Sequence, residues 1–479
     1  MYSRYLDRCP VGPLRFLLVG PLSAQFLSVF SERSFRASEI VILYVTTSDL
    51  ATIASAPLSA LQYCRFGHCQ SMTSTVALFP EGCPRLRTLS LDAVNFVPST
   101  GFPSLTHLHM SHPTFFSGPG YSMREFFAFL SGCPNLRTMF FEVPQVGFVA
   151  RESTHDNLGG LTVQLEHLER LVIVDRHYLN FDPGAEDERM VFLRAFFSHV
   201  STPPSCVVRL GDIPLSDLSN CTALFRFTGN PTSWRIYKGE NIPYDSSYTD
   251  TMSIQVFSAA DGRYLWLDII TATLDPSAVD DEVLELTNVL AQSPVFANAR
   301  EVWIDPGCAW LLSTGQEPLL SHMPNLESLV VRRDVGEPTS LRDSKILQAL
   351  EPTNWRSKGA EASPGSTLEP RAMTCPQLST LRIDCLTDED AVYALQLAAS
   401  REAVGVPLTR VTLGRTFRGR KKVCMLHQYD GGGEVIRVGS ARSDALLDHW
   451  MAQLSPICLD ESEDCEPYWR SWRWSSLPK

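Results

Sequence analysis

A six-residue pattern of apolar and polar positions, apolar-x-x-apolar-x-apolar, recurs along most of this chain of 479 residues. Its nine copies begin at Leu58, Leu86, Leu105, Leu136, Leu168, Ala299, Leu326, Leu378 and Leu408. In five copies a proline lies two residues before the first apolar position, and in three of these a cysteine precedes the proline. One such hexamer arises easily by chance, but nine copies with a shared lead-in indicate a repeat protein.

Each copy predicts a short strand of a parallel sheet. The second and third apolar positions are two residues apart, so they point to one face, and the residues beside them point to the other. Proline has no N–H to give to a strand ladder, so we place it directly before the strand. The residues expected to be buried are Leu89, Leu91, Leu108, Met110, Met139 and Phe141. Those expected on the opposite face are Thr88, Ser90, His107, His109, Thr138 and Phe140.

Helical patterns separate the predicted strands. Ser122 and Glu125 form a capping box before apolar residues at helical spacing, and this helix should end at Gly132. Further helices are predicted through 190–196, 340–350 and 388–397. Units of about 20–30 residues with one strand and one helix predict an α/β fold, an irregular leucine-rich-repeat solenoid. Its parallel strands should line a concave face, with the helices outside.

The pattern divides the chain into five segments. Residues 1–54 form an N-terminal cap or degenerate first repeats, with strands expected at 14–19 and 40–45. The others are N-terminal repeats at 55–179, degenerate or decorated repeats with a hairpin at 180–298, C-terminal repeats at 299–415, and a cap with a hairpin, a helix and a Trp-rich tail at 416–479. Residues 180–298 could instead link two arrays, but their apolar content favours one continuous solenoid. The terminal tryptophans could form a recognition peptide, although a cap on the last repeat is preferred.

Composition and charge narrow the classes of function. The 53 Asp and Glu outnumber the 41 Lys and Arg, and a net charge of −12 argues against a nucleic-acid binder. No apolar run approaches the ~18–20 residues of a membrane helix. The 13 scattered cysteines are typical of free buried thiols, so we expect a reducing location, cytoplasmic or nuclear. Pro21 interrupts the weakly apolar stretch 16–24, which argues against a signal peptide.

The sequence gives only weak signals for a metal, nucleotide or catalytic site. His107, His109 and His112 could share a metal, but no Asp, Glu or Cys nearby completes a tetrahedral set. The segment 64–69 has two cysteines without a second pair, and 414–421 lacks the lysine and the hydroxyl of a phosphate loop. The common catalytic motifs are missing as well. We therefore expect no enzyme, with no catalytic residue, no metal and no cofactor.

Three of the repeats carry a family resemblance. Cys-Pro-Asn-Leu-Arg-Thr-Met-Phe-Phe at 133–141, Met-Pro-Asn-Leu-Glu-Ser-Leu-Val-Val at 323–331 and Cys-Pro-Gln-Leu-Ser-Thr-Leu-Arg-Ile at 375–383 resemble the repeats of F-box/leucine-rich-repeat proteins, notably the set of mushroom-forming fungi. The similarity covers most of residues 55–415. It implies substrate recognition for a cullin-type ubiquitin ligase, with an adaptor subunit bound through an F-box.

The F-box itself is not recognisable. Such proteins usually open with a helical module that carries a Leu-Pro-x-Glu-like signature, and residues 1–57 contain none. Whether the module was lost or is missing from a truncated gene model stays open. The alternative is an orphan leucine-rich-repeat module for binding or scaffolding, without a ubiquitin-ligase connection.

The concave face is where we expect a protein partner to bind a monomeric chain. An exposed Phe, Trp and Val beside arginines suit an apolar contact with carboxylates around it. The predicted contact residues are His107, His109, Phe140, Glu142, Arg170, Val172, Trp303, Val330, Arg332, Arg382, Asp384 and Arg410. Trp303 and Arg382 are the expected hot spots. Alternatively, the inserts at 180–298 or 357–372 fold back over this face.

Overall fold

The computed structural model divides the chain into two compact units, residues 1–299 with 314–322 and residues 300–313 with 323–479. Within them it describes residues 12–69, 71, 73–80, 82–111, 121–142, 160–174, 185–214, 231–238, 242–244, 247–258, 263–271, 296–304, 308, 319–331, 346–352, 373–385, 388–415, 426–430 and 434–438. Each unit is described by itself.

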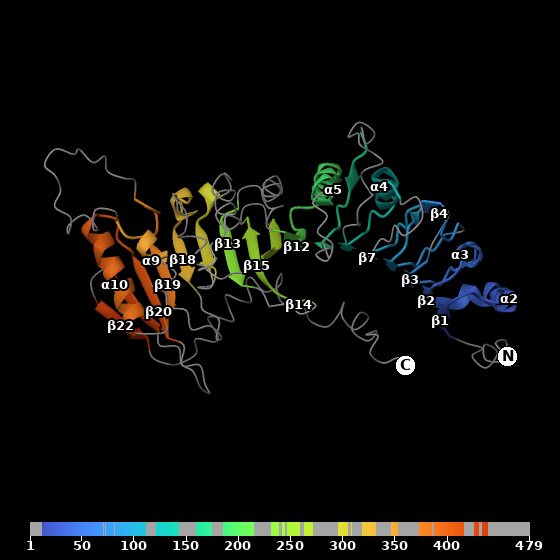
Figure 1. Cartoon of the computed structure of the whole chain (residues 1–479), viewed down its shortest axis with the longest axis horizontal. Coiled ribbons are helices and arrows are strands. Elements are labelled where there is room, and N and C mark those ends of the chain that lie inside the picture. Colours follow the sequence, from blue (N-terminus) through green and yellow to red (C-terminus); the bar gives the residue numbers. More distant parts are fainter. Residues whose placement is uncertain are drawn as a thin grey trace. The chain divides into compact units, whose positions relative to one another are not determined.

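The N-terminal unit contains a long parallel sheet of short strands (Figure 1). In spatial order these are β1 (Leu14–Val19), β2 (Ala37–Leu43), β3 (Tyr63–Gly67), β5 (Thr88–Asp92), β7 (His107–Ser111), β8 (Thr138–Glu142), β10 (Arg170–Val174), β12 (Val207–Pro214) and β16 (Tyr264–Thr271). Each strand pairs in parallel with the next, which is the arrangement of stacked repeats.

An antiparallel segment follows at the far end of this sheet. β15 (Ser247–Phe257) pairs with β16, and both β13 (Ser233–Lys238) and β14 (Ile242–Tyr244) pair with β15. Two smaller parallel pairs lie outside the main sheet: β4 (Thr75–Val76) with β6 (Val97–Pro98), and β9 (Val163–Gln164) with β11 (Val200–Ser201).

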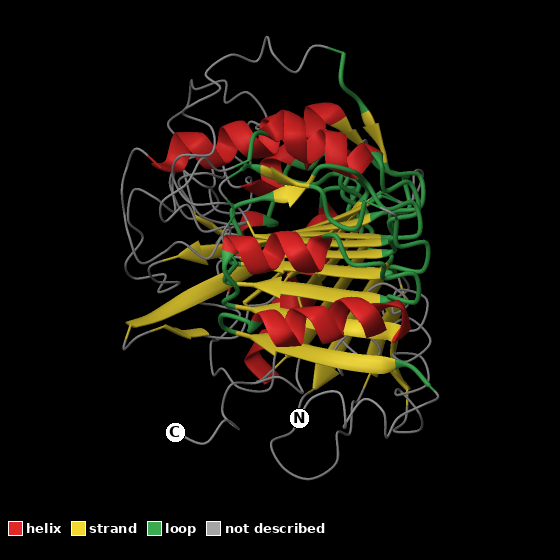
Figure 2. Cartoon of the chain, turned by 90° about the vertical axis from the view of Figure 1, so that its right-hand side faces the viewer, coloured by secondary structure: helices red, strands yellow, loops and turns green. Residues whose placement is uncertain are grey.

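Helices cover one face of the N-terminal sheet. They are α2 (Ala24–Arg33), η1 (Ser34–Arg36), α3 (Thr47–Ala54), α4 (Met123–Ser131) and α5 (Ala185–His199), with the short 3₁₀ helices η6 (Phe296–Asn298) and η8 (Leu319–His322). Figure 2 shows the strands side by side, with the helices packed next to them. Phe141 of β8 lies between these layers, with ring centroids 5.2 Å from Phe126 of α4 and 4.9 Å from Phe192 of α5. The face away from the helices is called the open face below.

The C-terminal unit repeats the plan. β17 (Glu301–Ile304), β18 (Ser328–Val331), β19 (Thr380–Cys385) and β20 (Arg410–Arg415) pair in parallel, and β21 (Leu426–Asp430) and β22 (Glu434–Val438) continue the sheet in antiparallel fashion. Its helices are α9 (Ile346–Ala349) and α10 (Asp388–Ala403).

A buried guanidinium ties the helices of this unit to a repeat. Arg401 of α10 is fully buried and donates to the backbone carbonyl oxygens of Leu350, Thr374 and Cys375 at 3.4, 3.3 and 2.8 Å. Burial lowers the pKa of Arg401, but three carbonyl acceptors offset part of the cost of burying the charge. This side chain therefore links α9, α10 and the turn that precedes β19.

The predicted fold is confirmed in its class and in most elements. Strands and helices alternate in a largely parallel α/β sheet, and both predicted hairpins form, as β15–β16 and β21–β22. The helix at Ser122 begins with the predicted capping box and ends at Gly132. The six residues expected to be buried, from Leu89 to Phe141, are at most 2% exposed. The insert at 357–372 lies outside the described residues, as do the helix and the Trp-rich tail of the C-terminal cap.

The lead-in to each repeat is a tight turn. The N–H of the first apolar residue donates to the carbonyl oxygen three residues earlier, as from Leu86 to Cys83, at 3.0 Å. The same bond joins Leu105 to Phe102, Leu136 to Cys133, Leu326 to Met323 and Leu378 to Cys375. The proline therefore occupies the second position of a turn, which its fixed φ favours, and does not lie directly before the strand as expected. The residue before it is buried and anchors the turn in the core.

The first predicted copy of the repeat was placed three residues too early. The expected frame put Tyr63 on the buried face, but Tyr63 begins β3 on the open face, in register with Thr88. Leu58 is instead the lead-in residue, because its carbonyl oxygen accepts from the N–H of Leu61 at 3.1 Å. The inner positions of this copy are Cys64 and Phe66, both fully buried.

Among the described helices, none is long and apolar enough to cross a membrane.

Substitution of the inner residue Leu108 should weaken the fold. Leu108→Ala removes three carbons from a side chain that is 2% exposed, so the free energy of unfolding should fall by about 2–5 kcal/mol. Thr138→Ala, on the open face of the adjacent strand, should cost under about 1 kcal/mol. Urea unfolding of the full chain measures both changes. Equal losses would mean that the two faces of the sheet are assigned in reverse.

Candidate functional site

The register of the strands aligns side chains of the N-terminal open face into rows. The central row is defined here as Arg65, Ser90, His109, Phe140, Val172, Arg209 and Trp266, one residue from each strand between β3 and β16. Neighbouring strands are ~4.8 Å apart, so adjacent members of the row are within contact distance. The row therefore forms one continuous surface, although its members are far apart in the sequence.

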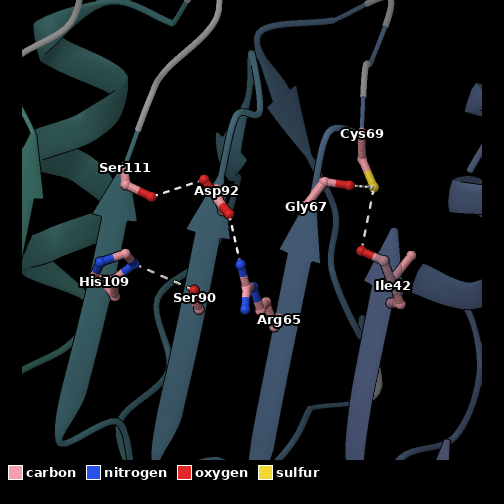
Figure 3. Close-up of polar contacts among 8 residues, drawn as sticks. All are labelled: Ile42, Arg65, Gly67, Cys69, Ser90, Asp92, His109 and Ser111. Atoms are coloured by element: carbon pink, nitrogen blue, oxygen red, sulfur yellow. Dashed lines mark hydrogen bonds and ion pairs between the residues drawn. The ribbon is translucent and has the colours of Figure 1, made fainter. Parts of the chain in front are cut away.

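A charged cluster occupies the N-terminal end of the row (Figure 3). Arg65 Nη2 lies 2.7 Å from Asp92 Oδ2, and Ser111 Oγ donates to Asp92 Oδ1 at 2.9 Å. Burial opposes ionisation of Asp92, but the hydrogen bonds from Arg65 and Ser111, with the charge of Arg65, outweigh it and lower the pKa of this carboxyl. Asp92 is therefore ionised at neutral pH and fixes the side chain of Arg65.

Aromatic and aliphatic side chains occupy the middle of the row. His109 Nδ1 lies 3.4 Å from Ser90 Oγ, and the His109 ring stacks on Phe140 with centroids 4.5 Å apart and planes 18° apart. Val172 follows Phe140 in register on β10. All three of His109, Phe140 and Val172 are half-buried, so the open face has an apolar centre that solvent reaches. A solvated sheet face normally has polar side chains at such positions.

A second arginine–aspartate pair closes the row at its other end. Arg209 Nε donates to Asp268 Oδ2 at 2.9 Å, and the indole N–H of Trp266 donates to Asp268 Oδ1 at 2.7 Å. The guanidinium carbon of Arg209 also lies 4.1 Å from the centroid of the Trp266 ring, which is a cation–π geometry. Asp268 thereby holds both side chains in one arrangement.

The predicted contact residues fall into two groups. In the N-terminal unit, His107, His109, Phe140, Arg170 and Val172 lie together on the open face, half-buried. Glu142 belongs to the same face but is fully buried, so its carboxylate does not reach the surface. Burial also lowers the pKa of His107, which keeps this imidazole neutral at physiological pH.

The remaining predicted residues belong to the C-terminal unit. Trp303, Val330, Arg382 and Thr412 form a row there by strand register. The Trp303 indole N–H donates to Glu301 Oε1 at 2.8 Å, and Val330 between its two neighbours is only 5% exposed. Arg410 is exposed at the start of β20. Arg332 and the side chain of Asp384 lie outside the described residues.

Several residues of the row were not predicted as contact residues. They are Arg65, Ser90, Arg209 and Trp266, and Asp268 beside the row was not predicted either. Both arginine–aspartate pairs involve at least one of these residues. The sequence did carry a signal for Trp266 and Asp268. Together with Tyr264 they occupy every second position in one strand of the predicted hairpin, so all three must lie on the same face. Their position beside Arg209 could not be inferred, since Arg209 and Asp268 are 59 residues apart.

The described residues offer little for metal or thiol chemistry. Within them, no group of three or more His, Cys, Asp or Glu is placed to hold a metal ion, and His112 lies outside them. Seven of the described cysteines are buried free thiols. Burial raises the pKa of Cys83 and of Cys133 to about 12, so these thiols are protonated at neutral pH. Cys69, whose thiol donates to the Gly67 and Ile42 carbonyl oxygens, has its pKa raised by burial to about 11 (Figure 3).

Comparison with models of known protein families gives no match for this chain, and comparison with curated protein sequences gives none either.

The lowered pKa of Asp92 predicts a loss of stability in acid. The folded-state pKa lies below the value of about 3.8 expected in the unfolded chain, so ionised Asp92 stabilises the fold above that pH. This contribution should disappear as the pH falls below about 4 toward the folded-state pKa. Asp92→Asn should therefore be less stable than the wild type at pH 6, and the difference should shrink at pH 3.

Urea unfolding at both pH values measures this effect. The matched control is Glu169→Gln, which removes a solvent-exposed ion pair with Arg137 at 3.3 Å and should change stability little at either pH. A stability difference between Asp92→Asn and the wild type that is the same at both pH values would contradict the assignment.

Proposed function

We propose that this chain recognises another protein through the open face of its N-terminal unit. The observation that carries the proposal is the central row, which places stacked His109 and Phe140, Val172, and a Trp266-bound Arg209 on the face opposite the helices. Aromatic residues and arginine dominate the energetics of protein interfaces, and a fixed arrangement reduces the entropy lost on binding.

The rigidity of this surface favours recognition of a partner over catalysis. Each residue of the row from Ser90 to Arg209 is on a strand that is paired on both sides, so the backbone beneath it is fixed. Polar side chains of the row are engaged with neighbours on the same face, as Arg65 is with Asp92 and Arg209 is with Asp268. Such groups orient a partner better than they activate a reacting atom.

We further propose that the recognised protein is a substrate of a cullin-type ubiquitin ligase. Support comes from the resemblance of residues 133–141, 323–331 and 375–383 to F-box/leucine-rich-repeat proteins. The buried free thiols favour a reducing compartment, cytoplasmic or nuclear, in which such ligases act. The alternative is a recognition or scaffold module without a ligase. Capture of the ligase adaptor together with the full chain supports the first proposal, and capture of a partner without any adaptor supports the second.

Loss of the apolar centre should weaken partner capture. The double variant Phe140→Ala/Val172→Ala removes the two half-buried apolar side chains from the middle of the row, so partner affinity should fall at least about 10-fold. The control is Thr88→Ala/Thr138→Ala, on the same face outside the row, and it should bind as the wild type does. Affinity capture from cell extract, with thermal unfolding as a check of folding, measures both. Wild-type capture by the apolar double variant would contradict the proposal.

The row of the C-terminal unit is the second candidate surface, favoured by Trp303 beside Val330 and Arg382. Each of Trp303→Ala and Arg382→Ala should cost at least ~2 kcal/mol of partner affinity if this row contacts the partner. The same capture assay tests them, with Thr380→Ala as the control on the adjacent open-face position. Wild-type binding by the double variant Trp303→Ala/Arg382→Ala would remove this row from the interface.

A further inference from the structure

The two arginine–aspartate pairs of the row have the same placement but use different nitrogens of the guanidinium group. In each, an arginine in the central row pairs with an aspartate two residues further along the adjacent strand. Arg65 uses a terminal nitrogen, Nη2, for this bond, whereas Arg209 uses Nε. Arg65 is therefore turned toward Asp92, while Arg209 keeps both terminal nitrogens for other acceptors.

Exposure separates the two arginines further. The Arg209 side chain is 38% exposed and that of Arg65 is 22% exposed. A guanidinium carries five N–H donors, and the one on Nε of Arg209 is used by Asp268. Within the described residues, Asp268 is the one acceptor that Arg209 has. The remaining four donors form the fork that matches a carboxylate.

The surroundings of Arg209 favour an anion. Arg170 lies on the adjacent strand β10, half-buried on the same face, and adds a second positive charge. Among the described side chains on the open face of β8, β10, β12 and β16, the acidic ones are Asp268, which is bound to Arg209 and Trp266, and Glu142, which is fully buried. Val172 is the register neighbour of Arg209, and Phe140 is the neighbour of Val172. A cationic point therefore borders directly on an apolar one.

We propose that Arg209 binds a carboxylate side chain of the partner, and that the partner is an extended acidic peptide segment with an apolar residue close to that carboxylate. Two strand spacings separate Arg209 from Phe140, or ~10 Å, which an extended chain covers in about three residues. The apolar residue packs on Phe140 and Val172 while the carboxylate pairs with the terminal nitrogens of Arg209. This inference rests on the proposed function, because it specifies the partner of the same surface.

The test is selection of binders from a display library of random short peptides on the full chain. The wild type should enrich peptides with Asp or Glu about three residues from an apolar side chain. Arg209→Gln should lose the preference for the acid and keep the preference for the apolar residue. Arg65→Gln is the matched control and should keep both, since its guanidinium is turned toward Asp92.

Affinity measurements on one enriched peptide and its amide analogue, with Asn or Gln in place of the acid, complete the test. The amide analogue should bind the wild type about 10-fold or more weakly, since a hydrogen bond to a charged group is lost, and both peptides should bind Arg209→Gln equally. If Arg209→Gln does not fold, Arg209→Lys, which keeps the charge without the fork, should show a reduced difference between the two peptides.

Three outcomes would overturn the inference. An acid preference that persists in Arg209→Gln means that the carboxylate binds elsewhere. Enrichment of apolar peptides without an acid contradicts the inference but leaves the proposed recognition function in place. If the folded wild type enriches no peptide at all, both the inference and the proposed function of this surface are wrong.

Discussion

One hydrogen bond, repeated in most of the turns that precede a repeat strand, sets the register on which the rest of this structure depends. The N–H of the first apolar residue of a repeat donates to a carbonyl oxygen three residues earlier, as from Leu136 to Cys133. The turn presents its buried first residue to the core, so the following strand can begin at only one position relative to its neighbour. Because side chains alternate along a strand, a slip of one residue would move the whole inner set to solvent.

Register on the buried face also determines the open face. When Leu108 and Met110 are fixed beneath the helices, His109 between them must point away and lie beside Ser90 and Phe140. The inner face has little freedom in chemistry, since it must remain apolar and close-packed. Side chains on the open face can vary without a change in the fold, so residues that bind a partner can occur there. The two arginine–aspartate pairs illustrate this, because they occupy equivalent positions on strands that are otherwise unrelated in sequence.

Because side chains alternate between the two faces of a strand, the sequence predicts which face a residue occupies but not which residues lie beside it on the neighbouring strands. The inner positions of β5, β7 and β8 and the capping box at Ser122 could be predicted, since each depends on residues within a few positions of one another. The frame of β3 could not, because Leu58, Leu61 and Tyr63 fill the pattern as well as Leu61, Cys64 and Phe66 do. The contact of Arg209 with Trp266 and Asp268 depends on the pairing of β12 with β16 across an antiparallel excursion. Nothing local in the sequence specifies that pairing.

The charges of the open face have a consequence for specificity. An arginine on a bare sheet would lose much of its side-chain entropy on binding and would accept many anionic partners. Asp268 and Trp266 fix the guanidinium of Arg209 before any partner binds, so little further side-chain entropy is lost on binding. Asp268 also neutralises part of its charge, which weakens long-range attraction for anions in general. Selectivity then depends on short-range geometry, since a ligand must satisfy the terminal nitrogens and cover Val172 and Phe140 at the same time.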